Sequence, residues 1–150
     1  MLDDLAASLS TAPDAAVGAL LPQFTQELAQ AFPALARVPA VALRLGEAEP
    51  VSALEMRRRA LVALRQLFSN LAAQRPLALE IDDLQWIDTD SASLLLKLLE
   101  APPRGLFLTL SYRSREALQN PAVAPVLAAL RRLPSGRRVD VEVGPLGAPE

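Results

Sequence analysis

The chain contains no cysteine, no histidine and only one lysine, Lys97, among its 150 residues. Without cysteine there are no disulfides, thiol nucleophiles or thiolate metal sites. Without histidine there is no Ser-His-Asp triad, no imidazole base and no ordinary zinc hydrolase site. Any chemistry must therefore come from carboxylates, arginines, hydroxyls, the single lysine or backbone amides.

Charge and hydropathy exclude further classes. The 17 acidic and 15 basic side chains are nearly balanced, so neither half of the chain has the basic excess that binding to a phosphate backbone requires. Residues 1–15 lack a basic n-region, and the longest uncharged run, Ala117–Leu130, has 14 residues and two prolines, well short of the ~20 that span a bilayer. We expect a soluble, cytoplasmic protein with no direct contact to nucleic acid or membrane.

Prolines divide the first half of the chain. Helical patterns cover Leu2–Ser10 and Asp14–Phe32, and Pro22 is expected to end or kink the second. Residues 33–50 contain three prolines, which predicts an irregular connection with a short extended piece at Ala40–Leu45. The 25 proline-free residues between Pro50 and Pro76 predict the clearest helix.

That helix has a start signal and an apolar stripe. Ser52-x-x-Glu55 is typical of a capping box. The apolar residues recur at helical spacing, at Leu54, Leu61, Leu64, Phe68 and Leu71. Three neighbouring arginines, residues 57–59, are expected to form a solvated helix face rather than a nucleic-acid contact.

After Pro76 short apolar runs alternate with helical stretches. Leu77–Ile81 and Leu106–Ser111 predict buried strands, while Val139, Val141 and Val143 alternate with charged residues and predict a strand with one solvated face. Helices are expected from Asp88 or Thr89 up to Pro102, and from an Asn120 cap to about Arg132. This order predicts an α/β fold, with a parallel sheet of about three strands flanked by helices and a helical N-terminal portion.

Two aspartates, Asp82 and Asp83, follow the first predicted strand directly. Ligands bind at the carboxyl ends of parallel strands because loops and helix N-termini converge there. One carboxylate at such an end can hold Mg²⁺, while its neighbour orients a water nucleophile. The same two residues could instead only cap the following turn.

The surroundings of this acidic pair resemble a known family. The run from Leu77 to Ser91, with its Asp-Asp-Leu-Gln-Trp-x-Asp core, is similar to the Walker B segment of AAA/STAND-type signalling ATPases. Leu106–Arg113 looks like the sensor strand of that family, and Gly144-Pro145-Leu146 resembles the junction with its helical lid. The resemblance covers roughly residues 57–146 and keeps the family's order of elements.

The resemblance implies a partial P-loop NTPase-like sheet with ATP and Mg²⁺ as its ligands. It implies Asp82 as the acid on the Mg²⁺ side, Asp83 at the position of the water-activating acid, and Arg113 as the γ-phosphate sensor. Hydrolytic relatives commonly have the longer glutamate where Asp83 stands, so slow turnover is expected. The variant is most similar to ATPase modules of large bacterial regulators, first those fused to serine/threonine kinase or histidine kinase domains, then LuxR-type transcriptional activators.

A phosphate-binding loop is missing from the sequence. A P-loop needs G-x-x-x-x-G-K-[ST], and Lys97 instead follows three leucines in a predicted helix. We expect that loop upstream of residue 1 and the lid and effector domains after Glu150. Residues 1–50 would then form a helical portion, 51–146 the Walker B and sensor portion, and 147–150 the start of a linker. Such a piece is expected to bind ATP poorly and to hydrolyse it negligibly.

The family's P-loop strand normally lies between the sensor strand and the next one. Without it, the last two predicted strands must pair directly or leave unpaired edges, so self-association or a protein partner is expected. Two other functions stay open: an ATPase-like scaffold that acts as an interaction module, and an unrelated carboxylate-dependent Mg²⁺ enzyme. Trp86 is expected to pack the acidic loop rather than to stack on a ligand.

Overall fold

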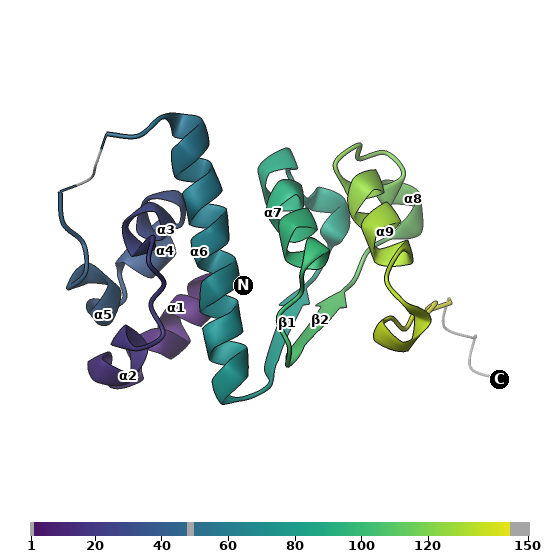
Figure 1. The fold of residues 1–150 in the computed structure, drawn as a ribbon. Coiled ribbons are helices and arrows are strands. Elements are labelled where there is room, and N and C mark those ends of the chain that lie inside the picture. The colour runs from purple at the N-terminus through teal and green to yellow at the C-terminus, as the bar shows by residue number, and fades with distance from the viewer. Residues whose placement is uncertain (1, 48–49, 145–150) are drawn as a thin grey trace.

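The computed structural model describes residues 2–47 and 50–144. Five short helices gather on one side of a long sixth helix (Figure 1): α1 (Leu2–Ser10), α2 (Asp14–Gly18), α3 (Thr25–Ala31), α4 (Pro33–Ala36), α5 (Pro39–Ala42) and α6 (Ala53–Gln74). The α/β elements lie on its other side: β1 (Leu77–Ile81), η1 (Leu84–Trp86), α7 (Thr89–Glu100), β2 (Leu106–Leu110), α8 (Ser114–Ala117), α9 (Val123–Arg131) and η2 (Ser135–Arg137).

The helical N-terminal portion follows the proline pattern except in residues 33–42, where α4 and α5 replace part of the irregular connection expected there. The helical run expected over 14–32 is interrupted between α2 and α3, around Pro22, as predicted. The extended piece expected at Ala40–Leu45 is wrong, because α5 occupies Pro39–Ala42. Pro39 takes the first helical position, where its fixed φ suits a helix, and Val41 becomes buried at 1% exposure. Burial against neighbouring helices decides the conformation here.

The long helix α6 begins as its sequence predicts. The Ser52 hydroxyl accepts a hydrogen bond from the Glu55 amide at 3.2 Å and caps the helix. One face of the helix is buried: Ala60, Ala63, Leu64, Leu67, Phe68 and Ala72. Leu54, which the spacing places on the apolar stripe, is 80% exposed in the first turn. The buried face packs mainly on α3 and carries the largest helix–helix contact of the molecule.

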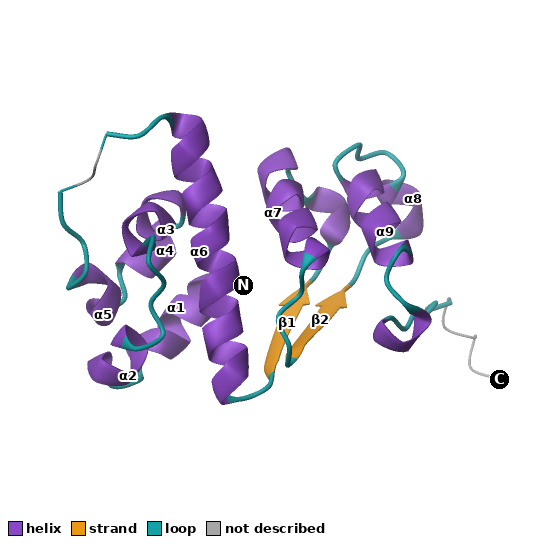
Figure 2. Cartoon of the chain, viewed as in Figure 1, coloured by secondary structure: helices purple, strands orange, loops and turns teal. Residues whose placement is uncertain are grey.

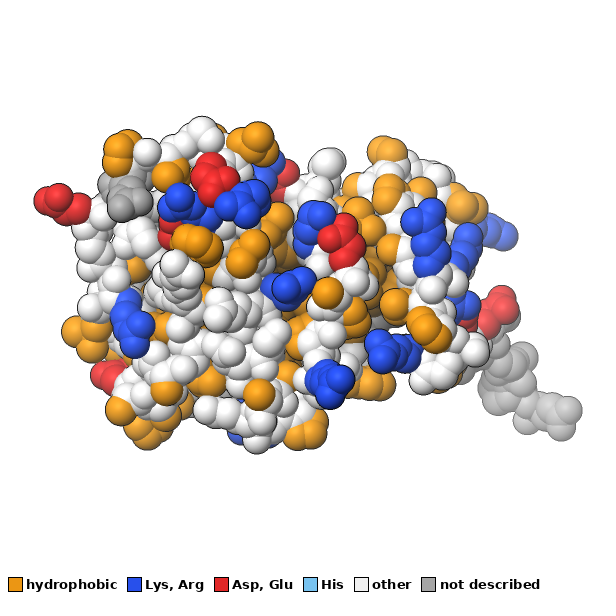
Figure 3. Space-filling view, in the orientation of Figure 1, with side chains coloured by type: hydrophobic (Ala, Val, Ile, Leu, Met, Phe, Trp, Pro, Cys, Tyr) orange, Lys and Arg blue, Asp and Glu red, His pale blue; other side chains and the backbone are white. Residues whose placement is uncertain are grey.

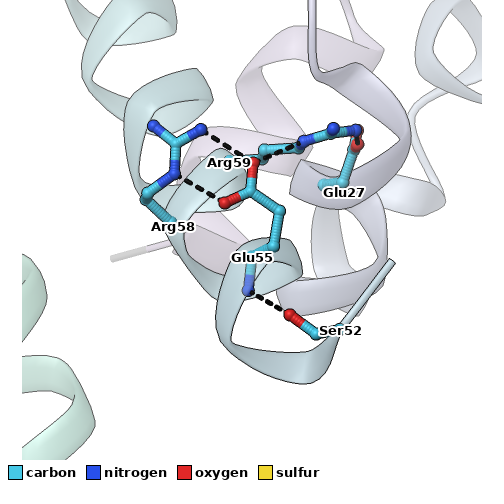
Figure 4. Close-up of polar contacts among 5 residues, drawn as sticks. All are labelled: Glu27, Ser52, Glu55, Arg58 and Arg59. Carbon is cyan, nitrogen blue, oxygen red and sulfur yellow. Dashed lines mark hydrogen bonds and ion pairs between the residues drawn. The ribbon is translucent and has the colours of Figure 1, made fainter. Parts of the chain in front are cut away.

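An ionic network joins α3 to α6, and we call it the α6 ion cluster: Glu27, Glu55, Arg58 and Arg59 (Figure 4). Both carboxylate oxygens of Glu55 accept from Arg58 at 2.7 Å, and Arg59 bonds Glu55 at 2.9 Å and Glu27 at 3.0 Å. The Arg59 guanidinium also lies 5.2 Å above the Phe24 ring. Arg58 is largely solvated, as expected, but Arg59 is only 24% exposed and holds two helices together.

The sheet described here has two strands, β1 and β2, which pair in parallel from Leu77 with Leu106 to Ile81 with Leu110 (Figure 2). The crossover between them contains α7, whose N-cap Asp88 accepts from the Ser91 amide at 2.6 Å. Gly105 has φ +80° before β2, and a Cβ there would lie 3.0 Å from the Ala72 carbonyl oxygen. Only glycine fits this turn against the end of α6.

The described residues cover only one face of the two strands. Alternate residues of both strands face the core, whereas Ala78, Glu80, Phe107 and Thr109 are exposed, Phe107 at 69%. The prediction of buried strands therefore holds for one face of each. We call the other surface, which carries those four residues, the open sheet face.

The third predicted strand is wrong. Val139, Val141 and Val143 are 86%, 78% and 88% exposed, and their segment pairs with no strand among the described residues. A strand needs a partner edge and a surface to cover, and after η2 the chain runs away from the sheet (Figure 1). The outer edge of β2 is therefore unpaired within 2–47 and 50–144. The α/β class and the partial parallel sheet flanked by helices are confirmed.

Beyond β2 the helices differ in detail from expectation. The helix predicted from Asn120 begins at Val123, and the Asn120 side chain accepts from the Ala122 amide at 2.9 Å. The short helix α8 was not predicted. In the described part of the chain, no helix combines the length and apolarity needed to cross a membrane.

Candidate functional site

The candidate site begins where the two strands end. Asp82 follows β1 and Ser111 follows β2, and because the strands pair in register these residues lie side by side. The Ser111 hydroxyl donates to Asp82 Oδ1 and accepts from the Asp83 amide at 3.1 Å. The Ser111 carbonyl accepts from the Leu84 amide at 2.8 Å. Three contacts with Ser111 thus tie the acidic turn to the end of the second strand.

Asp83 turns the chain sharply after the strand. Its φ of 55° is the only positive value of a non-glycine residue in the described ranges, and aspartate tolerates this left-handed conformation better than most residues. Both Asp82 and Asp83 are exposed. Each uses one carboxylate oxygen for a side-chain hydrogen bond, Asp82 with Ser111 and Asp83 with Gln85. The acidic pair is thus oriented by uncharged groups and accessible from solvent.

Gln85 connects this acidic turn to the segment of Arg113. The glutamine is 3% exposed. Its side-chain nitrogen donates to Asp83 Oδ1 at 2.7 Å, and its side-chain oxygen accepts from the Arg113 amide at 3.1 Å. The Asn120 side chain donates to the Gln85 and Ile87 carbonyls, each at 2.8 Å. The structure therefore joins the backbone of Arg113 to the predicted catalytic acid.

The guanidinium of Arg113 points elsewhere in this structure. It pairs with Glu116 at 3.2 Å, and its side chain is 72% exposed. Arg113 is also absent from the residues that line the large groove described below. Asp82 and Asp83 thus lie at the end of β1, while the guanidinium of Arg113, the predicted sensor group, lies to one side.

A groove of about 1160 Å³ runs from the acidic pair along the space between α6 and the β1–α7 unit. Its walls are mostly apolar, and hydrophobic side chains are visible between α6 and α7 (Figure 3). Arg57 of α6 and Asp90 of α7 both line it and pair at 3.1 Å. Trp86 lines the groove too but is 75% exposed. The expectation that Trp86 packs the loop is therefore wrong, because its ring lies on the surface.

The carboxylate oxygens at the acidic end of the groove suit a metal ion that takes its remaining ligands from water or from a second molecule. No cluster of three or more metal-ligating side chains occurs in the described part of the chain. Mg²⁺ is commonly bound by one or two carboxylates, while waters and substrate phosphates supply the other ligands. Asp82 and Asp83 provide such a partial set, since each carboxylate uses one oxygen for its side-chain hydrogen bond and keeps the other for a metal ion. The arrangement suits a Mg²⁺ ion whose remaining ligands are waters or phosphate oxygens.

Sequence reasoning missed two residues that shape this site. The sequence places Ser111 at the end of the second predicted strand. If two parallel strands end at the same level, the residue after each lies beside the other, which would have placed Ser111 next to Asp82. Gln85 lay within the motif without a role, because its contacts with Asp83 and Arg113 need the tertiary fold.

The fold places the chain in the α/β class, and comparison with known proteins gives the family. The family model described as AAA ATPase domain matches residues 2–110. The chain belongs to this family. The match includes the acidic turn and β2 and ends just before Ser111. No curated protein matches the chain, and no solved structure matches it.

Proposed function

We propose that the chain supplies the Mg²⁺-binding and sensor part of a regulatory ATPase domain. The observation that carries this proposal is the pair of exposed carboxylates at the carboxyl end of β1, held by Ser111 and Gln85. Family membership supports ATP and Mg²⁺ as the ligands. The fixed orientation and free oxygens of the pair support a role in catalysis over a role in capping a turn.

In this proposal the two aspartates have separate tasks. Asp82, oriented by Ser111, binds Mg²⁺ through its carboxylate. Asp83, held by Gln85, orients the attacking water and takes up its proton. Mg²⁺, when bound, neutralises charge that develops on the phosphate oxygens. The short aspartate side chain at position 83 favours slow turnover.

Arg113 is proposed to contact the γ-phosphate. Its present partner, Glu116, forms an exposed ion pair, and such pairs contribute little to stability. The guanidinium can therefore exchange Glu116 for a phosphate at small cost, and a phosphate offers it a bidentate contact. The tie between Gln85 and the Arg113 amide would remain in place during this exchange.

The proposal includes a phosphate cradle from outside this sequence. The sequence holds no G-x-x-x-x-G-K-[ST] motif, so the chain alone is expected to bind ATP weakly and to hydrolyse it negligibly. We propose residues 1–50 as the helical portion of the ATPase module and 51–146 as its Walker B and sensor portion. The α3–α6 interface and a family match that crosses residue 50 support this organisation. The linker expected at 147–150 lies outside the described residues.

The wider setting is proposed from the sequence resemblance alone. We propose a signalling or transcriptional regulator, with kinase-fused bacterial regulators first and LuxR-type activators second. The alternative is an ATPase-like scaffold that acts as an interaction module. This alternative is favoured by the open sheet face, with Phe107 69% exposed, and by the edge of β2, which has no partner strand in the described part of the chain.

A metal titration tests the main proposal. Trp86 is the only tryptophan and lies three residues after Asp83, so Mn²⁺, used in place of Mg²⁺, should quench its fluorescence when it binds the acidic pair. We expect saturable quenching of the native chain, competition by Mg²⁺, and loss of quenching in Asp82→Asn. Asp14→Asn, which removes an exposed aspartate far along the chain, is the matched control and should behave as native.

Two results would overturn the proposal. Equal quenching of the native chain and Asp82→Asn would show that the acidic pair binds no metal. Metal-dependent phosphatase activity of the purified chain, lost in Asp82→Asn, would identify an independent Mg²⁺ enzyme instead. Light scattering separates the scaffold alternative, since a chain that dimerises through the open sheet face without binding Mn²⁺ fits that role.

A further inference from the structure

One buried side chain at the site contacts both Asp83 and the Arg113 segment, and the proposed function gives no reason for this pairing. Among the described residues only Gln85 and Thr25 are buried polar or charged residues, with 3% and 4% exposure. Thr25 satisfies its hydroxyl locally, on the Pro22 carbonyl at 2.6 Å. The two ends of the Gln85 carboxamide instead form hydrogen bonds with two segments that are far apart in sequence.

We propose that Gln85 is a positioning residue that couples Asp83 to the Arg113 segment. The inference rests on the proposed function, because it concerns how the positions of the water-orienting acid Asp83 and the sensor Arg113 are coupled. The carboxamide is a short, planar group whose nitrogen holds Asp83 and whose oxygen holds the Arg113 amide. A movement of either segment must therefore break a hydrogen bond or move the other.

Three features make this bridge rigid. Asn120 donates to the carbonyls of Gln85 and Ile87 and so fixes the backbone that carries the glutamine. The Asn120 side chain is itself fixed, since it caps the Ala122 amide. Burial leaves the Gln85 side chain no alternative partner in water, so breaking either bond exposes an unsatisfied polar group. Because Asp83 is exposed, its side-chain orientation depends on the hydrogen bond from Gln85.

The chemistry of the carboxamide makes the proposal specific to glutamine. Leucine has a similar volume but neither donor nor acceptor, so Gln85→Leu removes both ties. Glutamate keeps an acceptor for the Arg113 amide and replaces the donor to Asp83 with a second negative charge. Gln85→Glu should therefore keep the Arg113 tie and lose the Asp83 tie. A side chain that only fills space would make no such distinction.

The test uses the full chain, labelled with ¹⁵N and studied without metal or nucleotide. The first measurement is hydrogen exchange at the Arg113 amide. We expect exchange ~5-fold faster or more in Gln85→Leu, the size expected for one lost hydrogen bond, and near-native protection in Gln85→Glu. Thr25→Val, which removes the other buried polar group, controls for a general loss of stability and should leave the Arg113 amide unchanged.

The second measurement follows the coupling itself. In the native background Asp83→Asn should shift the Arg113 amide resonance, and in the Gln85→Leu background the same change should leave it in place. Equal shifts in both backgrounds, or unchanged Arg113 protection in Gln85→Leu, would overturn the proposal. If Gln85→Leu does not fold, Gln85→Glu decides, because loss of Arg113 protection in that variant contradicts the assigned acceptor.

The two proposals can fail separately in these experiments. The coupling is measured without ligand, whereas Asp82 and Mn²⁺ are tested by the quenching of Trp86. Coupling without Mn²⁺ binding would support the bridge and reject the ATPase role. Mn²⁺ binding without coupling would support the ATPase role and reject the bridge.

Discussion

Two groups of carboxylates in this chain have opposite surroundings. In the α6 ion cluster, Glu55 and Glu27 are bonded to arginines, and these bonds hold the pKa of Glu55 at about 2, through Arg58 first and Arg59 second. At the end of β1, Asp82 and Asp83 are bonded to a serine and a glutamine. The first group has its countercharges within the protein, whereas the side-chain donors to the second, among the described residues, are neutral.

This difference separates structural charge from charge available to a ligand. Ion pairs within the α6 ion cluster hold two helices together and leave little charge for an outside partner. Neutral donors orient a carboxylate without cancelling its charge, so the acidic pair can still attract a cation. Surroundings, rather than exposure alone, therefore indicate which acids are candidates for function.

The largest expected effect is a loss of stability when the packing of α3 against α6 is disturbed. Leu28 of α3 is fully buried, and Leu28→Ala should lower the free energy of unfolding by about 2–5 kcal/mol because it leaves a cavity. Urea denaturation followed by circular dichroism measures this loss. Leu118→Ala, at a leucine that is 87% exposed, is the control and should change stability by no more than ~0.5 kcal/mol. Similar losses in both would contradict the assigned core.

A smaller effect is expected within the α6 ion cluster. Arg59→Met keeps an unbranched apolar side chain but leaves Glu27, whose side chain is 12% exposed, without its partner. The thermal unfolding midpoint should fall, while the quenching of Trp86 by Mn²⁺ should persist. Arg58→Met removes a more exposed arginine and should cost less.

The corresponding variant in the acidic pair is Asp82→Asn. It should abolish quenching by Mn²⁺ and leave the unfolding midpoint unchanged or slightly higher, because it removes repulsion from the adjacent Asp83. If Arg59→Met also abolished quenching, or if Asp82→Asn destabilised the chain as much as Arg59→Met, the two groups would not have separate roles.

The smallest expected effect is a dependence on pH. The folded state holds the pKa of Glu55 at about 2, below its ordinary value of 4.5. Between these values the unfolded chain binds a proton that the folded chain does not, so stability should fall as the pH drops from about 4.5 to 2. Glu55→Gln should be less stable at pH 6 and should lose less on acidification to pH 3. Asp88, whose pKa the Ser91 amide lowers, contributes to acid sensitivity in both proteins.

Local signals in the sequence predicted most elements correctly. The Ser52 cap, the Asp88 cap and the two apolar runs at 77–81 and 106–110 all act through neighbouring residues, so they can be recognised without the fold. The acidic turn was predicted for the same reason, since its position at a strand end follows from one apolar run.

The remaining features depend on contacts between distant residues. The segment that forms α5 becomes helical because Val41 is buried against other helices, and the valines after η2 alternate correctly but have no edge to pair with. The contacts of Gln85 with Asp83 and Arg113 require both strand ends to be in place. Such interactions leave no periodicity or spacing for sequence reasoning to find.

The parallel pairing of β1 with β2 also decides when the site forms during folding. The α3–α6 region brings together segments of the first half of the chain, but parallel strands can meet only after the crossover through α7 has closed. Pairings of this kind form slowly because the cost of closing the loop comes before the gain. We expect the contact between Asp82 and Ser111 to form only after this crossover has closed. A chain with its helices already built would still lack the oriented acids.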